Sequence, residues 1–426
     1  MNFKCGQSEL SFPLNQWKEV SILEASQTDQ QSEESHIIEA LKHPISSKPL
    51  SELIGPDETV CIVVSDITRA YQRMWVYLPH LIQELEKANV PDENIFFLSA
   101  NGTHRQQSQA EHRKILGDAL YDRFSIYEHF GADLTSVTSV GVTQYGNEIK
   151  LNTRALQADH IILTGAIVFH DLAGFGGGRK SLLPGIAASE SIQRNHRLAL
   201  VGDKGDLHPD MGSGKMDKNP LNREMQEVAD WIKPSFILNV AIGGNGKISQ
   251  AFAGHYRAAH QAGQDFVRNQ DGKWIDKQGD LVIGSAGGHP KDINFYQATK
   301  AISNMVGAVK PGGTLLLFAE CAEGIGYQEM ADILLSPKDI PSLAKMLLKQ
   351  FSVARYIGFW MRTVTKRMEV LLVSNLPSEP LATIGIRNFT DADSAYAYLE
   401  GKSDIEHVIA IPKAGQVYAQ WKENNQ

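Results

Sequence analysis

The feature that most constrains the fold is an alternation of short apolar runs with helical patterns along most of the chain. The run VCIVVSD (60–66) is β-branched and nearly continuous, which is typical of a strand buried on both faces. The segment after it, WVYLPHLIQELEKANV, has apolar residues at the i, i+3, i+4, i+7 spacing of an amphipathic helix. Further strands are predicted at NIFFLSANG (94–102), HIILTGAIVF (160–169) and SFILNVAIGG (235–244).

A second series of such units begins near residue 280. Strands are predicted at DLVIGSAGG, PGGTLLLFAEC, EVLLVSNL and HVIAIPKA, and helices at INFYQATKAISNMVGAV, PSLAKMLLKQ and DADSAYAYLEG. Strands that alternate with helices in this way predict an α/β protein, here two α/β domains with mostly parallel sheets.

A polar stretch at 256–279 separates the two series and is the predicted domain boundary. We expect an N-terminal α/β domain over 1–270 and a C-terminal α/β domain over 280–412. A C-terminal tail over 413–426 could pack back on the N-terminal domain.

Composition narrows the class of protein. The 426 residues are 42% hydrophobic and 21% charged, as in ordinary soluble proteins, and the net charge of −8 gives no overall case for binding nucleic acid or an anionic membrane. The three cysteines lack a CxxC pair, which argues against a disulfide framework or a cysteine zinc site. No apolar leader or 18-residue apolar run is present, so we expect a cytoplasmic protein.

Several familiar motifs are incomplete or absent. GFGGGR has Arg179 where a dinucleotide fingerprint needs its last glycine, and GSGKM lacks the Ser/Thr and the upstream glycine of a P-loop. HExxH, GxSxG and an EF-hand loop do not occur. These absences weaken the case for a plain NAD enzyme, an ATPase, a zinc protease or a serine hydrolase.

In α/β sheets, ligands bind at the carboxyl ends of the strands, so residues just after strands are the candidates. Arg69 in SDITR could clamp a carboxylate or phosphate, although Asp66 could equally cap the next helix and pair with Arg69 at the surface. His104 in GTHR and His170 in FHDL could be acid/base groups or structural histidines. Two histidines at two strand ends suit an enzyme that inverts a stereocentre, because each face of the carbon needs a proton carrier.

Lys180 directly follows the loop glycines Gly176, Gly177 and Gly178. It could pair with an anion, act as a desolvated amine that bonds covalently, or be a solvated lysine after a tight turn. His196 could be a metal ligand, although a lone histidine more often is not. Gln297 and Lys300 share a face of a helix start, which is a natural anion site or a solvated surface. Together these residues predict an active site in a cleft between the two domains.

The motifs SDITR, GTHR, FHDLAGFGGGRKSLLPG, NHR and INFYQATKA, in this order, resemble those of the nickel-pincer lactate racemase family. The resemblance covers both predicted domains and includes the spacing of Lys180 between His170 and His196. It implies a racemase or epimerase, an isomerase, that inverts C2 of a 2-hydroxy acid. The cofactor implied is a nickel pincer nucleotide made by separate maturation enzymes.

The resemblance also assigns roles to residues. It implies that Lys180 carries the cofactor through a thioamide bond, that His196 is the protein ligand to nickel, and that Asp66, Thr68 and the loop glycines help to position the site. The implied catalytic residues are His104 and His170 as the acid/base pair and Arg69, Gln297 and Lys300 as the carboxylate clamp. Backbone N–H groups of the glycine loop would approach the cofactor.

The implied chemistry suits a very weakly acidic Cα–H. One histidine takes the hydroxyl proton while hydride moves to the pincer, a planar 2-oxo acid forms, and hydride returns to the opposite face. The alternatives are a 2-hydroxy acid dehydrogenase or dehydratase on the same scaffold, or a non-catalytic protein that binds hydroxy acids or nucleotides.

The sequence departs from the lactate enzymes in two places. AYQR stands after Arg69, where the family usually has a proline, and Phe351 stands where the lactate enzyme has a tryptophan. Polar side chains at Tyr71, Gln72 and Arg73 could fit a longer or more polar 2-hydroxy acid, such as a sugar acid.

Overall fold

The structure, a computed structural model, describes residues 1–25, 31–202 and 206–422 and divides into two compact units. The N-unit comprises the described residues of Gln27–Ala199 and Asp210–Arg268. The C-unit comprises those of Met1–Ser26, Leu200–Pro209 and Asn269–Gln426.

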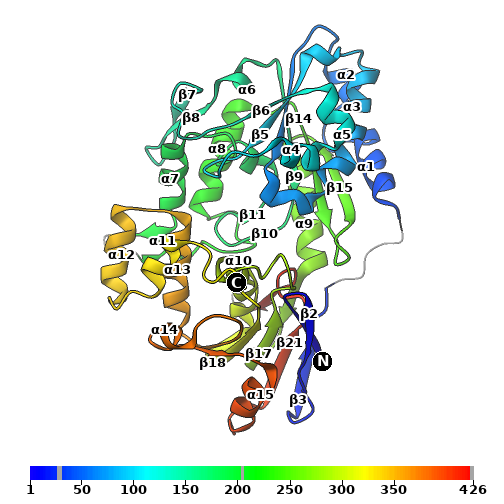
Figure 1. The fold of residues 1–426 in the computed structure, drawn as a ribbon. Helices are drawn as coiled ribbons and strands as arrows, with labels where there is room; N and C mark the ends of the chain where they lie inside the picture. Colours follow the sequence, from blue (N-terminus) through cyan, green and yellow to red (C-terminus); the bar gives the residue numbers. More distant parts are fainter. Residues whose placement is uncertain (26–30, 203–205, 423–426) are drawn as a thin grey trace. The chain divides into compact units, whose positions relative to one another are not determined.

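The N-unit is built on a six-stranded sheet of order β15-β14-β9-β4-β5-β6 (Figure 1). All neighbours pair in parallel except β14 and β15, which are antiparallel. The strands are β4 (Val60–Ser65), β5 (Ile95–Ala100), β6 (Ser125–Glu128), β9 (His160–Ala166), β14 (Phe236–Ile242) and β15 (Ile248–Gly254).

Helices cover both faces of this sheet, because its central strand is apolar on both sides. Val60, Ile62 and Val64 pack into one core cluster with α1 to α4, whereas Cys61 and Val63 pack into another with α6, α8 and α9. The helices are α1 (Glu33–Lys42), α2 (Leu50–Leu53), α3 (Met74–Lys87), α4 (Gln109–Leu116), α5 (Asp118–Arg123), α6 (Thr153–Gln157), α7 (Ser189–Arg197), α8 (Pro220–Ile232) and α9 (Ala258–Asp271). Two hairpins, β7–β8 (Val137–Val142, Glu148–Asn152) and β10–β11 (Phe169–His170, Gly174–Phe175), complete the unit.

The C-unit contains a second six-stranded sheet, of order β20-β19-β18-β17-β21-β3, in which all neighbours are parallel. Its strands are β3 (Glu19–Ile22), β17 (Gly279–Ser285), β18 (Val309–Phe318), β19 (Glu369–Val373), β20 (Ile386–Phe389) and β21 (His407–Ile411). Its helices are α10 (Phe295–Met305), α11 (Gln328–Leu334), α12 (Ile340–Lys349), α13 (Val353–Val364), α14 (Ser378–Ala382) and α15 (Ala392–Glu400). Short strand pairs are β1–β2 (Asn2–Cys5, Ser8–Ser11), β12–β13 (Leu200–Val201, Asp206–Leu207) and β16–β22 (Gly272–Ile275, Tyr418–Trp421). The predicted class, two α/β domains with mostly parallel sheets, is confirmed.

The domain boundaries differ from the predicted ones. The first residues of the chain belong to the C-unit, because β3 pairs in parallel with β21 and the side chains of Phe3, Phe12 and Trp17 are buried against its sheet. The described part of the tail belongs to the C-unit, because β22 pairs there with β16. Residues 423–426 lie outside the described residues. The N-terminal domain predicted over 1–270 is therefore an internal segment.

One strand end also differs. The run 160–169 is not a single strand, since β9 ends at Ala166 and His170 lies in the separate hairpin β10–β11. None of the helices in the described part of the chain is long and apolar enough to cross a membrane.

Candidate active site

Asp66 and His104 form a hydrogen-bonded pair at the carboxyl ends of the neighbouring strands β4 and β5. The Asp66 Oδ2 atom lies 2.6 Å from His104 Nδ1. The other oxygen, Oδ1, accepts hydrogen bonds from the backbone N–H (2.7 Å) and the hydroxyl (2.5 Å) of Thr68, so Asp66 also caps the short 3₁₀ helix η1 (Ile67–Gln72). The interpretation of Asp66 as a helix cap is confirmed, and the same carboxylate also holds His104.

The electrostatics of this pair suit an oriented histidine. Burial alone would raise the pKa of Asp66, but hydrogen bonds from His104 and Thr68 and the charge of Arg69 outweigh it and hold the pKa below its usual value. The carboxylate therefore accepts the Nδ1–H of His104, which leaves Nε2 as the nitrogen able to take a proton. The His104 side chain is 44% exposed, whereas that of Asp66 is only 6% exposed. The guanidinium of Arg69 donates to the Thr68 hydroxyl at 3.3 Å, beside this pair.

His170 contacts the candidate attachment residue directly. Its Nε2 atom lies 2.8 Å from Lys180 Nζ. Its Nδ1 atom accepts the backbone N–H groups of Leu172 (3.1 Å) and Ala173 (3.2 Å), and Asp171 Oδ1 lies 3.1 Å from the same nitrogen. The hairpin β10–β11 thus fixes the ring with one nitrogen toward the backbone and the other toward the lysine.

Two of the three backbone N–H groups of the glycine loop before Lys180 are hydrogen-bonded within the protein. The N–H of Gly176 donates to Val168 O (2.8 Å) and that of Gly178 donates to Asn239 Oδ1 (2.8 Å), so neither is directed at a cofactor. Gly177 and Gly178 have positive φ angles, and a Cβ atom on Gly178 would lie 2.9 Å from the ring of His260. The glycines therefore let the loop pack closely on strand β14 and helix α9.

Arg179 is buried beneath this loop, and its hydrogen-bond partners among the described residues are neutral. It donates to Asn222 Oδ1 (2.5 Å) and to the carbonyl of Ala173 (3.0 Å), and it lies against the ring of His260. Burial lowers its pKa to about 9. His260 in turn donates from Nε2 to Gly176 O (2.8 Å), and burial together with the charge of Arg179 lowers its pKa to about 3.

Lys180 is held in surroundings that disfavour its charge. Burial lowers its pKa to about 7, with further lowering from the charges of Arg69 and Arg179 and a partial offset from Asp171. An amine with such a pKa is about half uncharged at neutral pH, which a nucleophile requires.

His196 lies on α7, and among the described residues only its Nδ1 atom has a hydrogen-bond partner. Its neighbour Asn195 donates to the buried Glu224 at 2.8 Å and so fixes the helix. The His196 Nδ1 atom donates to Ile192 O at 2.8 Å, while burial and the nearby charge of Lys180 lower its pKa to about 4. The ring is therefore neutral with its Nε2 lone pair unprotonated, the form that binds a metal. Among the described residues, no three His, Cys, Asp or Glu side chains are grouped to hold a metal ion by themselves.

Gln297 and Lys300 lie one turn apart on α10 of the C-unit, as predicted. Lys300 Nζ donates to Gln297 Oε1 at 2.5 Å. The helix N-terminus is not open to an anion, because the N–H groups of Phe295, Tyr296 and Gln297 donate to Gly324 O, Ile325 O and Asn294 Oδ1. Any ligand bound at this helix start would be held by side chains and not by the first-turn amides.

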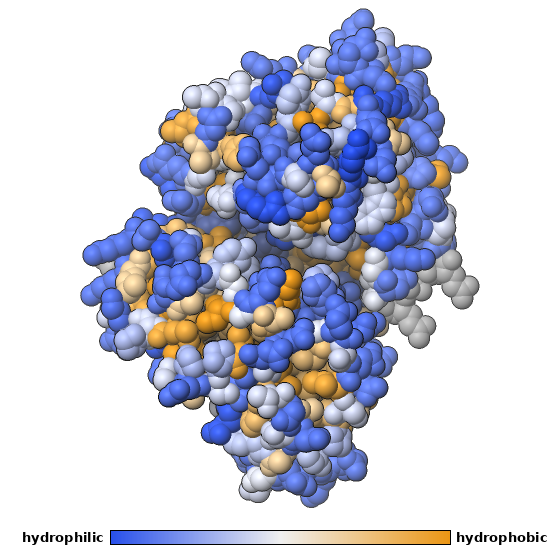
Figure 2. Space-filling view, viewed as in Figure 1, coloured by the Kyte–Doolittle hydropathy of each residue, from blue (hydrophilic) through white to orange (hydrophobic). Residues whose placement is uncertain are grey.

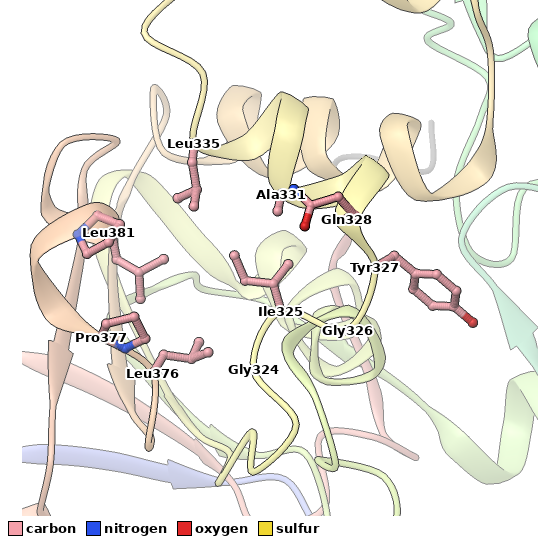
Figure 3. Close-up of a pocket in the computed structure, with 11 residues that line it drawn as sticks. Gly324, Ile325, Gly326, Tyr327, Gln328, Ala331, Leu335, Leu376, Pro377 and Leu381 are labelled. Atoms are coloured by element: carbon pink, nitrogen blue, oxygen red, sulfur yellow. The ribbon is translucent and has the colours of Figure 1, made fainter.

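The loop that closes this helix start also lines a pocket of about 330 Å³ (Figure 3). The side chains of Ile325, Leu335, Leu376 and Leu381 point toward one another there. Hydrophobic side chains are visible on the surface near α11 and α14 (Figure 2). None of the predicted catalytic residues lines this pocket, so it is separate from the candidate site.

Of Tyr71, Gln72 and Arg73, the side chains that could fit a longer substrate, Arg73 is already paired within the protein. The guanidinium of Arg73 is committed to a two-point ion pair with Glu33, at 2.6 and 2.8 Å. Gln72 is buried and Tyr71 is exposed. Phe351 lies between α12 and α13, with its ring centroid 6.2 Å from that of Tyr356.

Sequence reasoning missed the residues that support the lysine loop. Asn239 could have been noticed, because it is a polar residue within the apolar run SFILNVAIGG. Arg179 directly precedes Lys180, but only its burial shows that it contacts the loop from below. His260 carries no signal in the sequence.

Comparison with known proteins places the chain in a family. The pattern of the "Lactate racemase N-terminal domain" matches residues 5–207, and that of the "Lactate racemase C-terminal domain" matches residues 275–418. A lactate racemase of Thermoanaerobacterium thermosaccharolyticum is 35% identical over 324 residues, which are 75% of this chain and 74% of that protein. A lactate racemase of Lactiplantibacillus plantarum is 33% identical over 307 residues, which are 71% and 70% of the two chains.

Comparison with solved structures leads to the same family. The lactate racemase apoprotein of T. thermosaccharolyticum superimposes with a TM-score of 0.90 at 29% identity and covers 99% of both chains. A protein of Thermotoga maritima has a TM-score of 0.66 at 19% identity over 92% of this chain and 99% of the other, a likeness of fold alone. The predicted family and the predicted enzyme class, an isomerase of the racemase kind, are confirmed by the relatives. The chain belongs to the lactate racemase family.

Proposed function

We propose that this protein inverts the C2 configuration of a small 2-hydroxy acid, with lactate as the first substrate to test. The observation that carries the proposal is the group formed in the N-unit by the Asp66–His104 pair, the His170–Lys180 contact and the neutral His196. The relatives named lactate racemase supply the reaction and the substrate class.

The residues present fit a covalently held nickel pincer nucleotide. Lys180 offers a partly uncharged amine for attachment, and His196 offers the unprotonated Nε2 of a neutral imidazole as the protein ligand to nickel. When bound, this group supplies a reversible hydride acceptor beside the substrate. Separate maturation enzymes would provide it.

The side chains of the protein handle the charge and the proton of the substrate. Arg69, Gln297 and Lys300 bind the carboxylate, for which a guanidinium and an ammonium group are suited. Nε2 of His104 accepts the hydroxyl proton, and the imidazolium that results is stabilised by the Asp66 carboxylate 2.6 Å away. His170 serves the oxygen of the 2-oxo acid when the opposite configuration forms. Asp66 and Thr68 keep the site in position.

The test is racemisation of one pure enantiomer by protein produced together with the maturation enzymes and nickel. Chiral chromatography should show both enantiomers of lactate, or of a longer 2-hydroxy acid if lactate is not accepted. In D2O the product should keep hydrogen at C2, because hydride is transferred without exchange with solvent.

Other outcomes would point elsewhere. Deuterium at C2 of the product would show that the reaction removes C2–H as a proton and not as a hydride. Net accumulation of the 2-oxo acid would identify a dehydrogenase, loss of water a dehydratase, and binding without turnover a binding protein. Lys180→Ala protein that retained full activity would contradict the proposal.

A further inference from the structure

The contact between His170 and Lys180 depends on which of the two side chains carries the proton that they share, as well as on how they are placed. The two nitrogens are 2.8 Å apart, so one of them donates and the other accepts. Which one donates is decided by the far side of the histidine ring, because a neutral imidazole carries its proton on only one nitrogen.

The far side of the ring is occupied by hydrogen-bond donors. The N–H groups of Leu172 and Ala173 point at Nδ1 from 3.1 and 3.2 Å, so Nδ1 acts as an acceptor. The proton of the neutral ring is then on Nε2, and Nε2–H points at Lys180. An ammonium group could not accept that hydrogen bond, whereas an uncharged amine can.

We propose that His170 donates its Nε2–H to Lys180 in the protein without cofactor and thereby presents the lysine as an uncharged amine, ready to be acylated without a separate base. His170 is in this respect a positioning residue for Lys180. The inference rests on the proposed function only for the identity of the natural acyl donor.

The charged groups around the amine favour the same state. Arg69 and Arg179 both disfavour an ammonium at Lys180, and His196 is neutral. The opposing group is Asp171, whose carboxylate favours a positive charge on Lys180 and also lies 3.1 Å from His170 Nδ1. A reversed arrangement, with Nδ1–H donated to Asp171 and Nε2 accepting from an ammonium, is the competing structure.

Acylation would change the partner of His170. The Nζ lone pair attacks the acyl carbon, the C–N bond forms, the leaving group departs with the electron pair of its bond, and one amine proton passes to water. The resulting amide nitrogen no longer accepts a hydrogen bond. The Nε2–H of His170 is therefore released from the lysine, and its nitrogen becomes available to a substrate oxygen. Attachment of the acyl group to Lys180 and the availability of His170 to the substrate are therefore coupled through this one hydrogen bond.

The first experiment measures the pH profile of Lys180 acetylation in the protein without cofactor. N-acetoxysuccinimide is added briefly between pH 5 and 11, and peptide mass spectrometry compares Lys180 with the exposed Lys247 as an internal reference. Lys180 should reach half of its maximal rate near pH 7. In His170→Phe, which keeps a ring but has no nitrogen, the midpoint should move upward and acetylation at pH 7 should fall by about tenfold for each unit of the move. A downward move would show that His170 accepts from an ammonium and would overturn the proposal, as would an unchanged midpoint.

The second experiment reads the tautomer in the unaltered protein and does not depend on folding of the variant. Imidazole ¹⁵N NMR of histidine-labelled protein distinguishes a protonated from an unprotonated ring nitrogen, and the His170 signals are those lost in His170→Phe. Nε2 should be protonated and Nδ1 bare near neutral pH. The reverse pattern would refute the inference. Neither experiment uses the cofactor, so their failure is distinct from a failure to racemise.

Discussion

Replacing Lys180 with methionine should stabilise the protein without cofactor, by an amount that depends on pH. The folded state holds this amine where its pKa is about 7, whereas the unfolded chain has the ordinary value of 10.5. Between these values the unfolded state binds more protons, so the unaltered protein gains stability as the pH rises through this window. Methionine has a similar shape and no charge, so it removes this pH dependence.

The magnitude follows from the interval between the two pKa values. At 1.36 kcal/mol per pKa unit, charging Lys180 in the folded protein costs about 5 kcal/mol of stability when both states are fully protonated. The cost is about 4 kcal/mol at pH 7 and about 2 kcal/mol at pH 9. The stability advantage of Lys180→Met should therefore shrink by about 2 kcal/mol between these two pH values.

Urea unfolding of both proteins at pH 7 and pH 9 measures this difference. Comparing the two proteins at each pH cancels the titration of groups that do not interact with Lys180, including the buried cysteines. Lys247→Met, at an exposed position, is the matched control and should show no such trend. An advantage of Lys180→Met that stayed constant or grew with pH would refute the reasoning, because it would mean that Lys180 is an ordinary charged lysine in the folded protein.

Three further predictions concern individual residues. Asp66→Asn should lower kcat by about 100-fold or more, because His104 loses the carboxylate that orients it and stabilises its charge; steady-state kinetics with the loaded protein checks this, and a change confined to KM would contradict it. Gly178→Ala should cost about 1–3 kcal/mol more than Gly246→Ala, since both glycines have positive φ but only Gly178 faces a neighbouring ring; equal losses in urea unfolding would argue against close packing of the loop. His196→Ala should keep the mass increment on Lys180 but lose at least about tenfold in bound nickel by elemental analysis; full nickel retention would remove His196 as a ligand.

Sequence reasoning reached those parts of the structure that depend on local pattern. The strands β4, β5 and β14 were predictable because short runs rich in β-branched and aromatic residues that are buried on both faces have few alternatives. The positions of Asp66 and His104 followed from the rule that ligands bind at carboxyl ends of parallel strands, and these two ends meet as expected.

What could not be predicted depends on contacts that are distant in sequence. The strand β3 is only four residues long, and its partner β21 begins at His407, so nothing near residue 20 reveals the pairing. The close packing of the glycine loop was beyond sequence reasoning for a similar reason. Glycines show that backbone comes close to something, but only the fold reveals that Asn239 and His260 are among the neighbours.

The position of β3 has a consequence for how the chain is made. The edge strand β3 of the C-unit leaves the ribosome long before β21, the strand that it pairs with. The C-unit sheet therefore cannot be completed until β21 has been made, whereas the N-unit, which lies wholly between β3 and β21 in the sequence, can fold first. A fragment that began at residue 280 would lack an edge strand, and one that ended at residue 270 would carry that strand with no sheet to join. The fragment best suited to folding alone is accordingly internal, from about residue 31 to residue 268.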